Sequence, residues 1–308
     1  MNARDPWDVS VVMPTWNRPH YLRASIDAVL EQDIGFRELI LADDGSDATT
    51  RALLEAYAAR PGVHISWREH CGRPAAVRNA AIRAATGRYI AFADSDDLWE
   101  PGKLRRQRET LRARPECRWC FTSWSSIDAH GFARPEIPAP GYHELRGELL
   151  DLLATLSISV ALPAVVAERA LLLEAGLFEE SLACYEDYDL WVRLALLAQA
   201  AIVDEPLVRV RWHGERFSRG AALRQLRSRA HYFARAGQRV AGPARAVLRR
   251  RGALDAARVA GLAAQAGESD ALELLRGSFP DGWPSPRWWL LALQAHSRRW
   301  TRRVRVSP

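Results

Sequence analysis

Residues 89–99 read YIAFADSDDLW, an apolar run that ends in three carboxylates, Asp94, Asp96 and Asp97. Carboxylates this close together repel one another, and their burial without partners is costly. A hard divalent cation such as Mg²⁺ or Mn²⁺ removes the conflict, because it prefers oxygen ligands and can share them with a diphosphate. The stretch therefore favours a metal and nucleotide site at a strand end. The alternative is an Asp-rich turn, because Asp and Ser are common turn residues.

Similar units precede this stretch, in which apolar runs of strand length alternate with segments of helical period. The pattern predicts strands at 9–13, 39–42, 63–67 and 89–93, and helices at 21–32, 49–60 and 74–85. Such alternation is typical of βαβ units in a mostly parallel sheet, where ligands bind at the C-terminal strand ends. Pro14-Thr15, Asp43-Asp44 and Asp94–Asp97 all follow strands, so we expect three segments to converge on one edge.

The rest of the chain is less regular. We expect helices at 103–113, 145–153, 168–175 and 186–198, strands at 119–125, 158–166 and 201–212, and a Gly/Pro-rich loop at 131–141. Residues 221–308 are mostly helical by pattern and hold 17 Arg against 5 Asp or Glu, in a protein whose net charge is +6. The first 220 residues must therefore be acidic overall, and this asymmetry predicts a boundary near residue 220.

Composition limits the class of protein. With 308 residues, 48% hydrophobic and 26% charged, the chain is typical of a globular protein with a sizeable core. Its four cysteines are irregularly spaced, which argues against a disulfide framework or a zinc site and favours a reducing compartment. They are Cys71, Cys117, Cys120 and Cys184. No signal peptide precedes residue 10, and the longest uncharged run, residues 152–167, is 16 residues long, less than the ~20 that span a bilayer.

The loop after the first strand argues against other nucleotide-binding classes. Residues 13–18 read MPTWNR, without the GxGxxG of dinucleotide-binding dehydrogenases or a P-loop. They also lack the Asp pair that a phosphatase with a nucleophilic Asp carries directly after its first strand.

Four segments, in this order, resemble family-2 glycosyltransferases of the GT-A fold. They are VSVVMPTWNRPHYLRASIDAVLEQ (9–32), ELILADDGSDATT (38–50), CGRPAAVRNAAIRAATGRYIAFADSDDLWEPGKL (71–104) and AGLFEESLACYEDYDLWVRLA (175–195). The resemblance covers roughly residues 8–220. It implies an α/β GT-A catalytic domain over residues 1–220, with a mostly parallel Rossmann-like sheet flanked by helices. Its nucleotide-binding half would be 8–115 and its acceptor-side half 116–220, followed by an Arg/Trp-rich helical extension, 221–308.

The resemblance also implies which residues border the donor nucleotide. In the first loop these are Pro14, Thr15, Asn17 and Arg18. Asp44 matches the second Asp of the DDGS motif, which contacts the base or ribose, and a carboxylate suits uracil N3–H or ribose hydroxyls as an acceptor. The alternative for this pair of Asp residues is an Asx-turn or a helix N-cap.

Arg78 lies where the family places an arginine near the nucleotide, and the alternative is a solvated helix residue. Asp94, Ser95 and Asp96 match the family's DXD motif. The resemblance implies that Asp96 ligates Mn²⁺ or Mg²⁺, with Asp94 toward the ribose and as a further ligand, and Asp97 in support. The metal would bridge the donor diphosphate and neutralise the leaving group.

Glu186-Asp187 matches the family's ED motif, although carboxylates at a helix start are also favoured by the dipole alone. The resemblance implies that Asp187 is the general base in a single, inverting displacement, with Glu186 as second choice. His213 follows a predicted strand where related enzymes carry a metal or diphosphate ligand; the alternative is a structural or exposed histidine. Candidate phosphate-neutralising arginines are Arg209, Arg211, Arg216 and Arg219.

Two features bear on the membrane. Arg211-Trp212 echoes the QxxRW motif of processive synthases, but the Gln is missing and we expect no transmembrane helix. Residues 286–308 combine Trp with Arg, a composition typical of an interfacial membrane helix. The alternative is a terminal helix that docks on the catalytic domain or in a homodimer. No nucleic-acid motif is present. We therefore expect a cytoplasmic location, with peripheral contact at the inner membrane face as an option.

Together these observations predict a metal-dependent, inverting, non-processive glycosyltransferase of bacterial glycan or glycoconjugate biosynthesis. The donor would be a nucleotide-diphosphate sugar, most often UDP-linked in the family, and the acceptor a glycan, a lipid-linked glycan, a peptide or a small molecule. A GT-A-like nucleotidyltransferase is the first rival, but its usual Gly-rich basic loop is absent after the first strand. A non-catalytic sugar-nucleotide-binding scaffold is the second, and retention of Asp96 and Asp187 argues against it.

Overall fold

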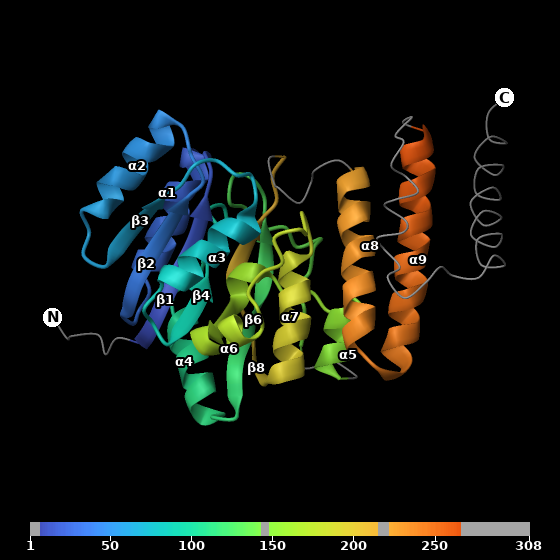
Figure 1. The fold of residues 1–308 in the computed structure, drawn as a ribbon. Helices are drawn as coiled ribbons and strands as arrows, with labels where there is room; N and C mark the ends of the chain where they lie inside the picture. The colour runs from blue at the N-terminus through green and yellow to red at the C-terminus, as the bar shows by residue number, and fades with distance from the viewer. Residues whose placement is uncertain (1–6, 143–147, 215–221, 266–308) are drawn as a thin grey trace. The chain divides into compact units, whose positions relative to one another are not determined.

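A computed structural model describes residues 7–142, 148–214 and 222–265 (Figure 1). These residues divide into two compact units. The first comprises 7–142, 148–181 and 186–214, and the second comprises 182–185 and 222–265. The second unit contains the helices α8 (Ala222–Arg239) and α9 (Gly242–Gln265).

The first unit is built on one eight-stranded sheet of order β3-β2-β1-β4-β7-β6-β8-β5. Its strands are β1 (Trp7–Thr15), β2 (Phe36–Asp43), β3 (Val63–Trp67), β4 (Tyr89–Phe92), β5 (Leu98–Trp99), β6 (Cys117–Ile127), β7 (Val165–Glu168) and β8 (Gln199–Arg211). β3, β2, β1 and β4 are all parallel and lie side by side in Figure 1. β7 is antiparallel to both β4 and β6, and β8 is parallel to β6. The sheet is therefore mixed, with its parallel half formed by the N-terminal strands.

Helices follow the strands as the periodicity predicts. Those of the first unit are α1 (Pro19–Leu30), α2 (Ala48–Ala58), α3 (Pro74–Ala84), α4 (Lys103–Ala113), α5 (Leu149–Ala154), α6 (Arg169–Glu174) and α7 (Glu186–Leu197). Proline opens α1 and α3, where its missing N–H costs nothing. Asp47 caps α2 by accepting a 2.8 Å hydrogen bond from the Thr50 N–H. The strands β1, β2 and β4 bury continuous apolar runs, as both faces of a parallel sheet require.

The predicted strand at 158–166 is largely wrong. Residues Leu162–Ala164 form a 3₁₀ turn, and the strand starts only at Val165. Pro163 explains the difference, because proline has no N–H to donate to a sheet ladder. β5, which pairs antiparallel with β8, escaped prediction because two residues carry no periodicity. The start of the predicted helix at 145–153 lies partly outside the described residues, which show α5 from Leu149.

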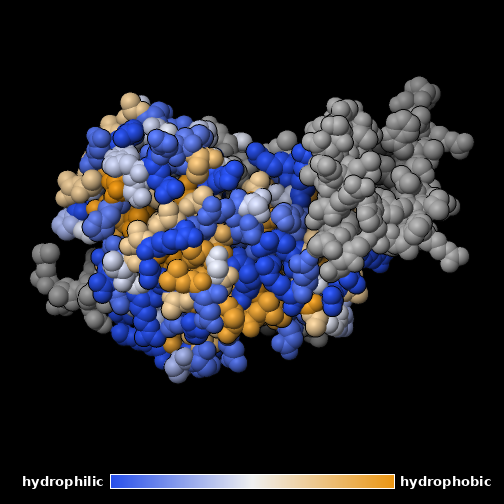
Figure 2. All heavy atoms as spheres, viewed as in Figure 1, coloured by the Kyte–Doolittle hydropathy of each residue, from blue (hydrophilic) through white to orange (hydrophobic). Residues whose placement is uncertain are grey.

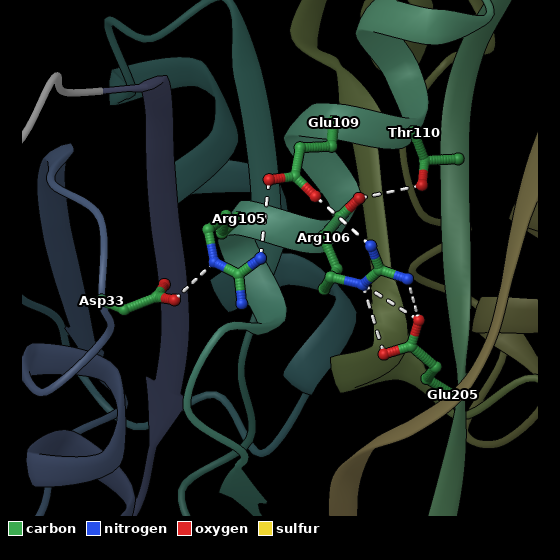
Figure 3. Close-up of polar contacts among 6 residues, drawn as sticks. All are labelled: Asp33, Arg105, Arg106, Glu109, Thr110 and Glu205. Atoms are coloured by element: carbon green, nitrogen blue, oxygen red, sulfur yellow. Dashed lines mark hydrogen bonds and ion pairs between the residues drawn. The ribbon is translucent and has the colours of Figure 1, made fainter.

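Figure 3 shows how exposed side chains tie α4 to its neighbours. Arg105 Nε donates to Asp33, which follows α1, over 2.7 Å. Arg106 pairs with Glu205 on β8 and also reaches Glu109 one turn on. Because these pairs are largely exposed, each contributes little to stability. The residues that Figure 2 colours are mostly hydrophilic on the face shown, with hydrophobic residues in patches among them.

α4 also carries an unusual buried cation. Lys103, the single lysine of the chain, is fully buried. Its ammonium lies 3.8 Å from the Trp99 ring centroid and donates to Gln107 Oε1 over 2.9 Å. Burial lowers the pKa of Lys103 to about 7. The neutral amine is therefore the form that the folded protein favours above that pH.

The Lys103→Met variant tests this lysine. Because the folded pKa lies below the ~10.5 of an unfolded lysine, the unfolded chain binds more protons between these values, and this group adds stability as pH rises. The stability of Lys103→Met relative to the natural protein should therefore fall by about 1 kcal/mol per pH unit from pH 7 to 8.5. Urea unfolding at four pH values measures this. Parallel pH profiles for the two proteins would contradict the pKa shift.

Candidate active site

Three strand-end loops meet at the C-terminal edge of the parallel strands. The Asp44 N–H donates to the Thr15 carbonyl over 2.9 Å, which joins the loops after β2 and β1. Asn17 strengthens this junction: its N–H donates to Ser46 Oγ over 2.8 Å, and its side-chain Oδ1 accepts from the Asp47 N–H over 2.9 Å. Asn17 thus shapes the loops that border the edge.

Asp44 organises the loop that follows β3. Its two carboxylate oxygens accept the N–H groups of Cys71 and Gly72, each over 2.9 Å. The His70 ring also approaches this carboxylate, at 3.1 Å. Gly45 has φ +74°, and a Cβ there would lie 2.7 Å from the backbone nitrogen of His70, so only glycine fits. By contrast, the Asp43 carboxylate accepts hydrogen bonds from the N–H groups of Gly45 and Ser46. Asp43 therefore forms the Asx-turn that was the alternative to nucleotide contact.

Two residues that sequence reasoning missed lie beside Asp44. The Trp16 ring stacks on the His70 ring, with centroids 4.6 Å apart and planes 20° apart. Trp16 is 48% exposed, which is unusual for the largest apolar side chain. The signal in the sequence was an aromatic residue in the loop directly after the first strand. The pair provides a flat aromatic surface at the site.

The Asp96 carboxylate is the meeting point of two distant segments. Its Oδ2 accepts from Arg18 Nη1 over 3.0 Å and lies 2.9 Å from His213 Nε2. Arg18 reaches it from the left-handed backbone conformation, with φ 61°, that precedes α1. The structure therefore brings the first loop, the Asp cluster and the residue that follows β8 together.

Asp97 and Arg211 hold this cluster in place. Asp97 Oδ1 accepts the Arg211 N–H over 2.7 Å, and Arg211 Nε donates to the Asp96 carbonyl over 2.8 Å. The Arg211 guanidinium also donates to the carbonyls of Asp128 and Ala129. Arg211 is thus a structural clamp rather than an open phosphate ligand, and Arg209 pairs with Glu100 over 2.8 Å. Arg216 and Arg219 lie outside the described residues.

The donor atoms around Asp96 fit a divalent cation. The 2.9 Å between Asp96 Oδ2 and His213 Nε2 suits a hydrogen bond and also two neighbouring ligands of one ion. His213 is buried, and its Nδ1 has no hydrogen-bond partner in the part of the chain that the structure describes. That part holds no ready-made group of three His, Cys, Asp or Glu side chains around a metal position. A diphosphate would have to supply further ligands.

Arg78 joins the Asp cluster to the start of α7. It is buried, and its guanidinium donates to Asp94 Oδ1 over 2.8 Å and to Glu186 Oε1 over 3.3 Å. Glu186 is 108 residues away in sequence, so only the fold reveals this bridge. The solvated alternative for Arg78 is wrong. One cation instead neutralises carboxylates from the two halves of the site.

The two carboxylates at the start of α7 are weaker acids than usual. Burial raises the pKa of Glu186 to about 7, with repulsion from Asp187 adding to the shift and Arg78 opposing it. Burial likewise raises the pKa of Asp187 to about 6, opposed by the Tyr188 N–H that donates to Asp187 Oδ1 over 2.8 Å. An Asp with such a pKa is a better proton acceptor near neutrality than an ordinary one.

The remaining candidates occupy supporting positions. Pro14 lies within β1, in register with Ala42 of β2. The Thr15 hydroxyl is buried without a hydrogen-bond partner in the described parts of the chain. Ser95 is buried between the two aspartates of the predicted DXD motif.

Comparison with known proteins places this edge in a family. Residues 10–157 match the model of "Glycosyl transferase family 2". This segment belongs to glycosyltransferase family 2. It contains the loops of Asp44 and Asp96 and the bridge residue Arg78, and it covers the first three resembling segments except for Val9.

Two relatives are similar to this family-2 segment. The putative teichuronic acid biosynthesis glycosyltransferase TuaG of Bacillus subtilis is 36% identical over 40% of this chain and 49% of its own length. The UDP-Glc:alpha-D-GlcNAc-diphosphoundecaprenol beta-1,3-glucosyltransferase WfgD of Escherichia coli is 40% identical over 33% of this chain and 40% of its own. The chain thus spans half or less of the length of these two curated relatives.

Solved structures confirm the GT-A fold. Staphylococcus aureus TarS, residues 1–349 with UDP-GlcNAc, has a TM-score of 0.60 at 18% identity, over 89% of this chain and 92% of that one. The mannosyltransferase PcManGT of Pyrobaculum calidifontis, with GDP-Man and Mn²⁺, has a TM-score of 0.58 at 20% identity, over 93% and 84%. At these identities the likeness concerns the fold.

Proposed function

We propose that the protein is a metal-dependent, inverting glycosyltransferase that moves a sugar from a nucleotide-diphosphate donor to an acceptor hydroxyl. The observation that carries the proposal is the buried Arg78, whose guanidinium donates to Asp94 and to Glu186, the neighbour of Asp187 in the chain. A donor-binding motif and a candidate base thereby face one reaction centre. The match of residues 10–157 to the model of glycosyl transferase family 2 supports the reaction class.

In this proposal each carboxylate has its own task. Asp187 accepts the proton of the acceptor hydroxyl as that oxygen bonds to the anomeric carbon and the bond to the diphosphate oxygen breaks. One displacement inverts the configuration. Glu186, which Arg78 holds, is the second choice as base. Asp96, His213 and Asp94 would hold Mn²⁺ or Mg²⁺, which when bound neutralises charge on the departing diphosphate.

The nucleotide would lie along the edge formed by Pro14, Thr15, Asn17 and Arg18, with the ribose at Asp94 and Ser95. Asp44 beside the Trp16–His70 pair suits a base that donates an N–H. UDP-sugars are the preferred donor class. In support, WfgD is named for UDP-Glc and TarS was solved with UDP-GlcNAc. PcManGT was solved with GDP-Man and Mn²⁺, which supports the use of a divalent metal. Its GDP-linked donor is the reason to test GDP as well as UDP.

Thermal shift with UDP, GDP and TDP, each with and without Mn²⁺, tests the donor site. We expect UDP at saturation to raise the Tm of the protein by about 5 °C. This shift should occur only when Mn²⁺ is present. Asp96→Asn should remove the metal-dependent part of the shift. Asp8→Asn, at an exposed ion pair with Arg37, is the matched control and should leave the shift intact. No metal-dependent shift with any nucleotide would count against the proposal.

The names of the relatives also support a class of acceptor and a biosynthetic role. The name of WfgD, with its diphosphoundecaprenol acceptor, supports a lipid-linked glycan, and TuaG supports a role in bacterial glycan biosynthesis. No helix in the described ranges is long and apolar enough to cross a bilayer. We propose a catalytic domain at residues 1–220, with halves 8–115 and 116–220, and an extension at 221–308. Membrane contact or dimerisation through 286–308 stays a prediction, because that segment lies outside the described residues.

A further inference from the structure

His213 is a buried histidine whose ring lacks the usual polar anchor. Its Nε2 lies 2.9 Å from Asp96 Oδ2, and its side chain is only 2% exposed. A histidine that ligates a metal normally donates a hydrogen bond from its other ring nitrogen, and this bond fixes the orientation of the ring. Nδ1 of His213 has no hydrogen-bond partner among the described residues. Within this part of the chain, packing has to orient the ring beyond its contact with Asp96.

The ring of Tyr21 packs on that of His213. The two ring centroids are 4.7 Å apart, and the ring planes are inclined by 47°. Tyr21 lies in the first turn of α1, where its N–H donates to the Arg18 carbonyl over 3.1 Å. The Arg18 side chain itself donates to Asp96 Oδ2 over 3.0 Å. One turn of α1 therefore contacts both members of the Asp96–His213 pair.

A second contact fixes the Tyr21 ring in place. The guanidinium carbon of Arg211 lies 4.9 Å from the centroid of this ring, which makes a cation–π contact. Arg211 cannot shift freely, because its Nε donates to the Asp96 carbonyl over 2.8 Å. A Tyr21 ring that turned away from His213 would lose this contact as well. The two contacts together favour one position of the tyrosine ring.

We propose that Tyr21 is a positioning residue that holds the His213 ring with Nε2 toward Asp96, so that the two side chains are preorganised for a divalent cation. The inference rests on the proposed function, because Asp96 and His213 are proposed metal ligands. Tyr21 acts through His213 and is not itself a ligand. Both of its contacts are made by the aromatic ring, so the ring and not the hydroxyl should matter.

Mn²⁺ binding to the full chain in the presence of UDP, measured by electron paramagnetic resonance, tests the proposal. Tyr21→Ala should weaken Mn²⁺ binding about 10-fold, as the loss of a residue that supports a metal ligand does. Tyr21→Phe keeps the ring and should bind Mn²⁺ like the natural protein. The matched control is Tyr57→Ala, which removes a buried tyrosine of α2 that donates to Asp27. It should lower stability and leave the Mn²⁺ affinity unchanged.

A second measurement needs neither metal nor activity. Diethyl pyrocarbonate modifies accessible imidazoles, and mass spectrometry of the peptide that contains His213 gives the rate of its modification. We expect His213 to react slowly in the natural protein and in Tyr21→Phe, and faster in Tyr21→Ala. His64, which lies on β3 with a side chain that is 62% exposed, is the internal reference and should react alike in all three proteins.

The outcomes separate this inference from the proposed function. Unchanged Mn²⁺ affinity in Tyr21→Ala, with weaker binding in Asp96→Asn and His213→Ala, would overturn the inference alone. Unchanged affinity in Asp96→Asn too would count against the proposed metal site, and the modification rate of His213 would then decide on Tyr21. Equal losses of affinity in Tyr21→Ala and Tyr57→Ala would reduce the effect to stability and overturn the inference. If circular dichroism shows that Tyr21→Ala is unfolded, Tyr21→Leu replaces it with the same expected results.

Discussion

Asp187→Asn should abolish sugar transfer while nucleotide binding persists. An amide keeps the shape of the carboxylate but cannot accept the hydroxyl proton, and a lost general base costs about 10²–10⁴-fold in rate. Asp187 does not bond the Arg78 guanidinium in the structure, whereas Glu186 does. We therefore expect the larger loss in kcat for Asp187→Asn and an unchanged thermal shift with the cognate nucleotide and Mn²⁺. Release of the nucleotide diphosphate measures turnover.

The pH profile of kcat offers a second measure of Asp187. Burial raises the pKa of Asp187 to about 6, and the base must be deprotonated to act. Activity should therefore rise with pH through about 6 and level off above it. Asp151→Asn, on α5, is the matched control and should keep both the rate and the profile. A large loss in Glu186→Gln with full activity in Asp187→Asn would transfer the role of base to Glu186.

Arg78→Leu should have the largest effect on stability. Its removal leaves Asp94, Glu186 and Asp187 without the cation that neutralises them, and breaking a buried ion pair costs about 3–5 kcal/mol. The loss should shrink as pH falls below about 7, because protonation of Glu186 relieves the repulsion. Urea unfolding at pH 5.5 and 8 measures both effects.

Arg83→Leu supplies the control for Arg78→Leu. Arg83 lies on the same helix, α3, but is exposed in its last turn, so its replacement should change stability by less than about 0.5 kcal/mol. Donor binding should also fall in Arg78→Leu and persist in Arg83→Leu. If Arg78→Leu were as stable as the control at both pH values, Arg78 would not bridge the site in the way the structure indicates.

The sequence predicts local features of the fold well. α4 and β3 begin and end at the predicted residues, and most other elements agree within three residues. These elements are recognisable because apolar period, glycine and proline are local signals. The strand at β7 was misplaced because Pro163 divides an apolar run that looks continuous in sequence. The order of the strands after β4 in the sheet could not be predicted from local sequence patterns, because it depends on pairing between strands that are far apart in the chain.

In the candidate site, too, the sequence identifies individual residues but not the contacts between distant segments. Resemblance indicated Asp44, Asp96 and Asp187 by position alone. It could not indicate that Arg78 spans 108 residues to Glu186, because this contact arises only when α7 and α3 pack on the same sheet. The stacking of Trp16 on His70 likewise joins loops that no short motif connects. Motifs thus identify chemical groups, while the fold decides which of them meet.

The position of β8 has a consequence for biosynthesis. β8 is the last strand of the described sheet, and it pairs with both β6 and β5. β6 pairs with β7 on one side and with β8 on the other. Until residues 199–211 leave the ribosome, the edge of β6 that faces β8 has no partner strand and can pair with other chains, which promotes aggregation. Arg211, which clamps the Asp96–Asp97 loop, arrives at the end of the same strand. The loop of Asp96 and Asp97 can therefore be fixed only after Arg211 has been synthesised, although the loop itself is made much earlier.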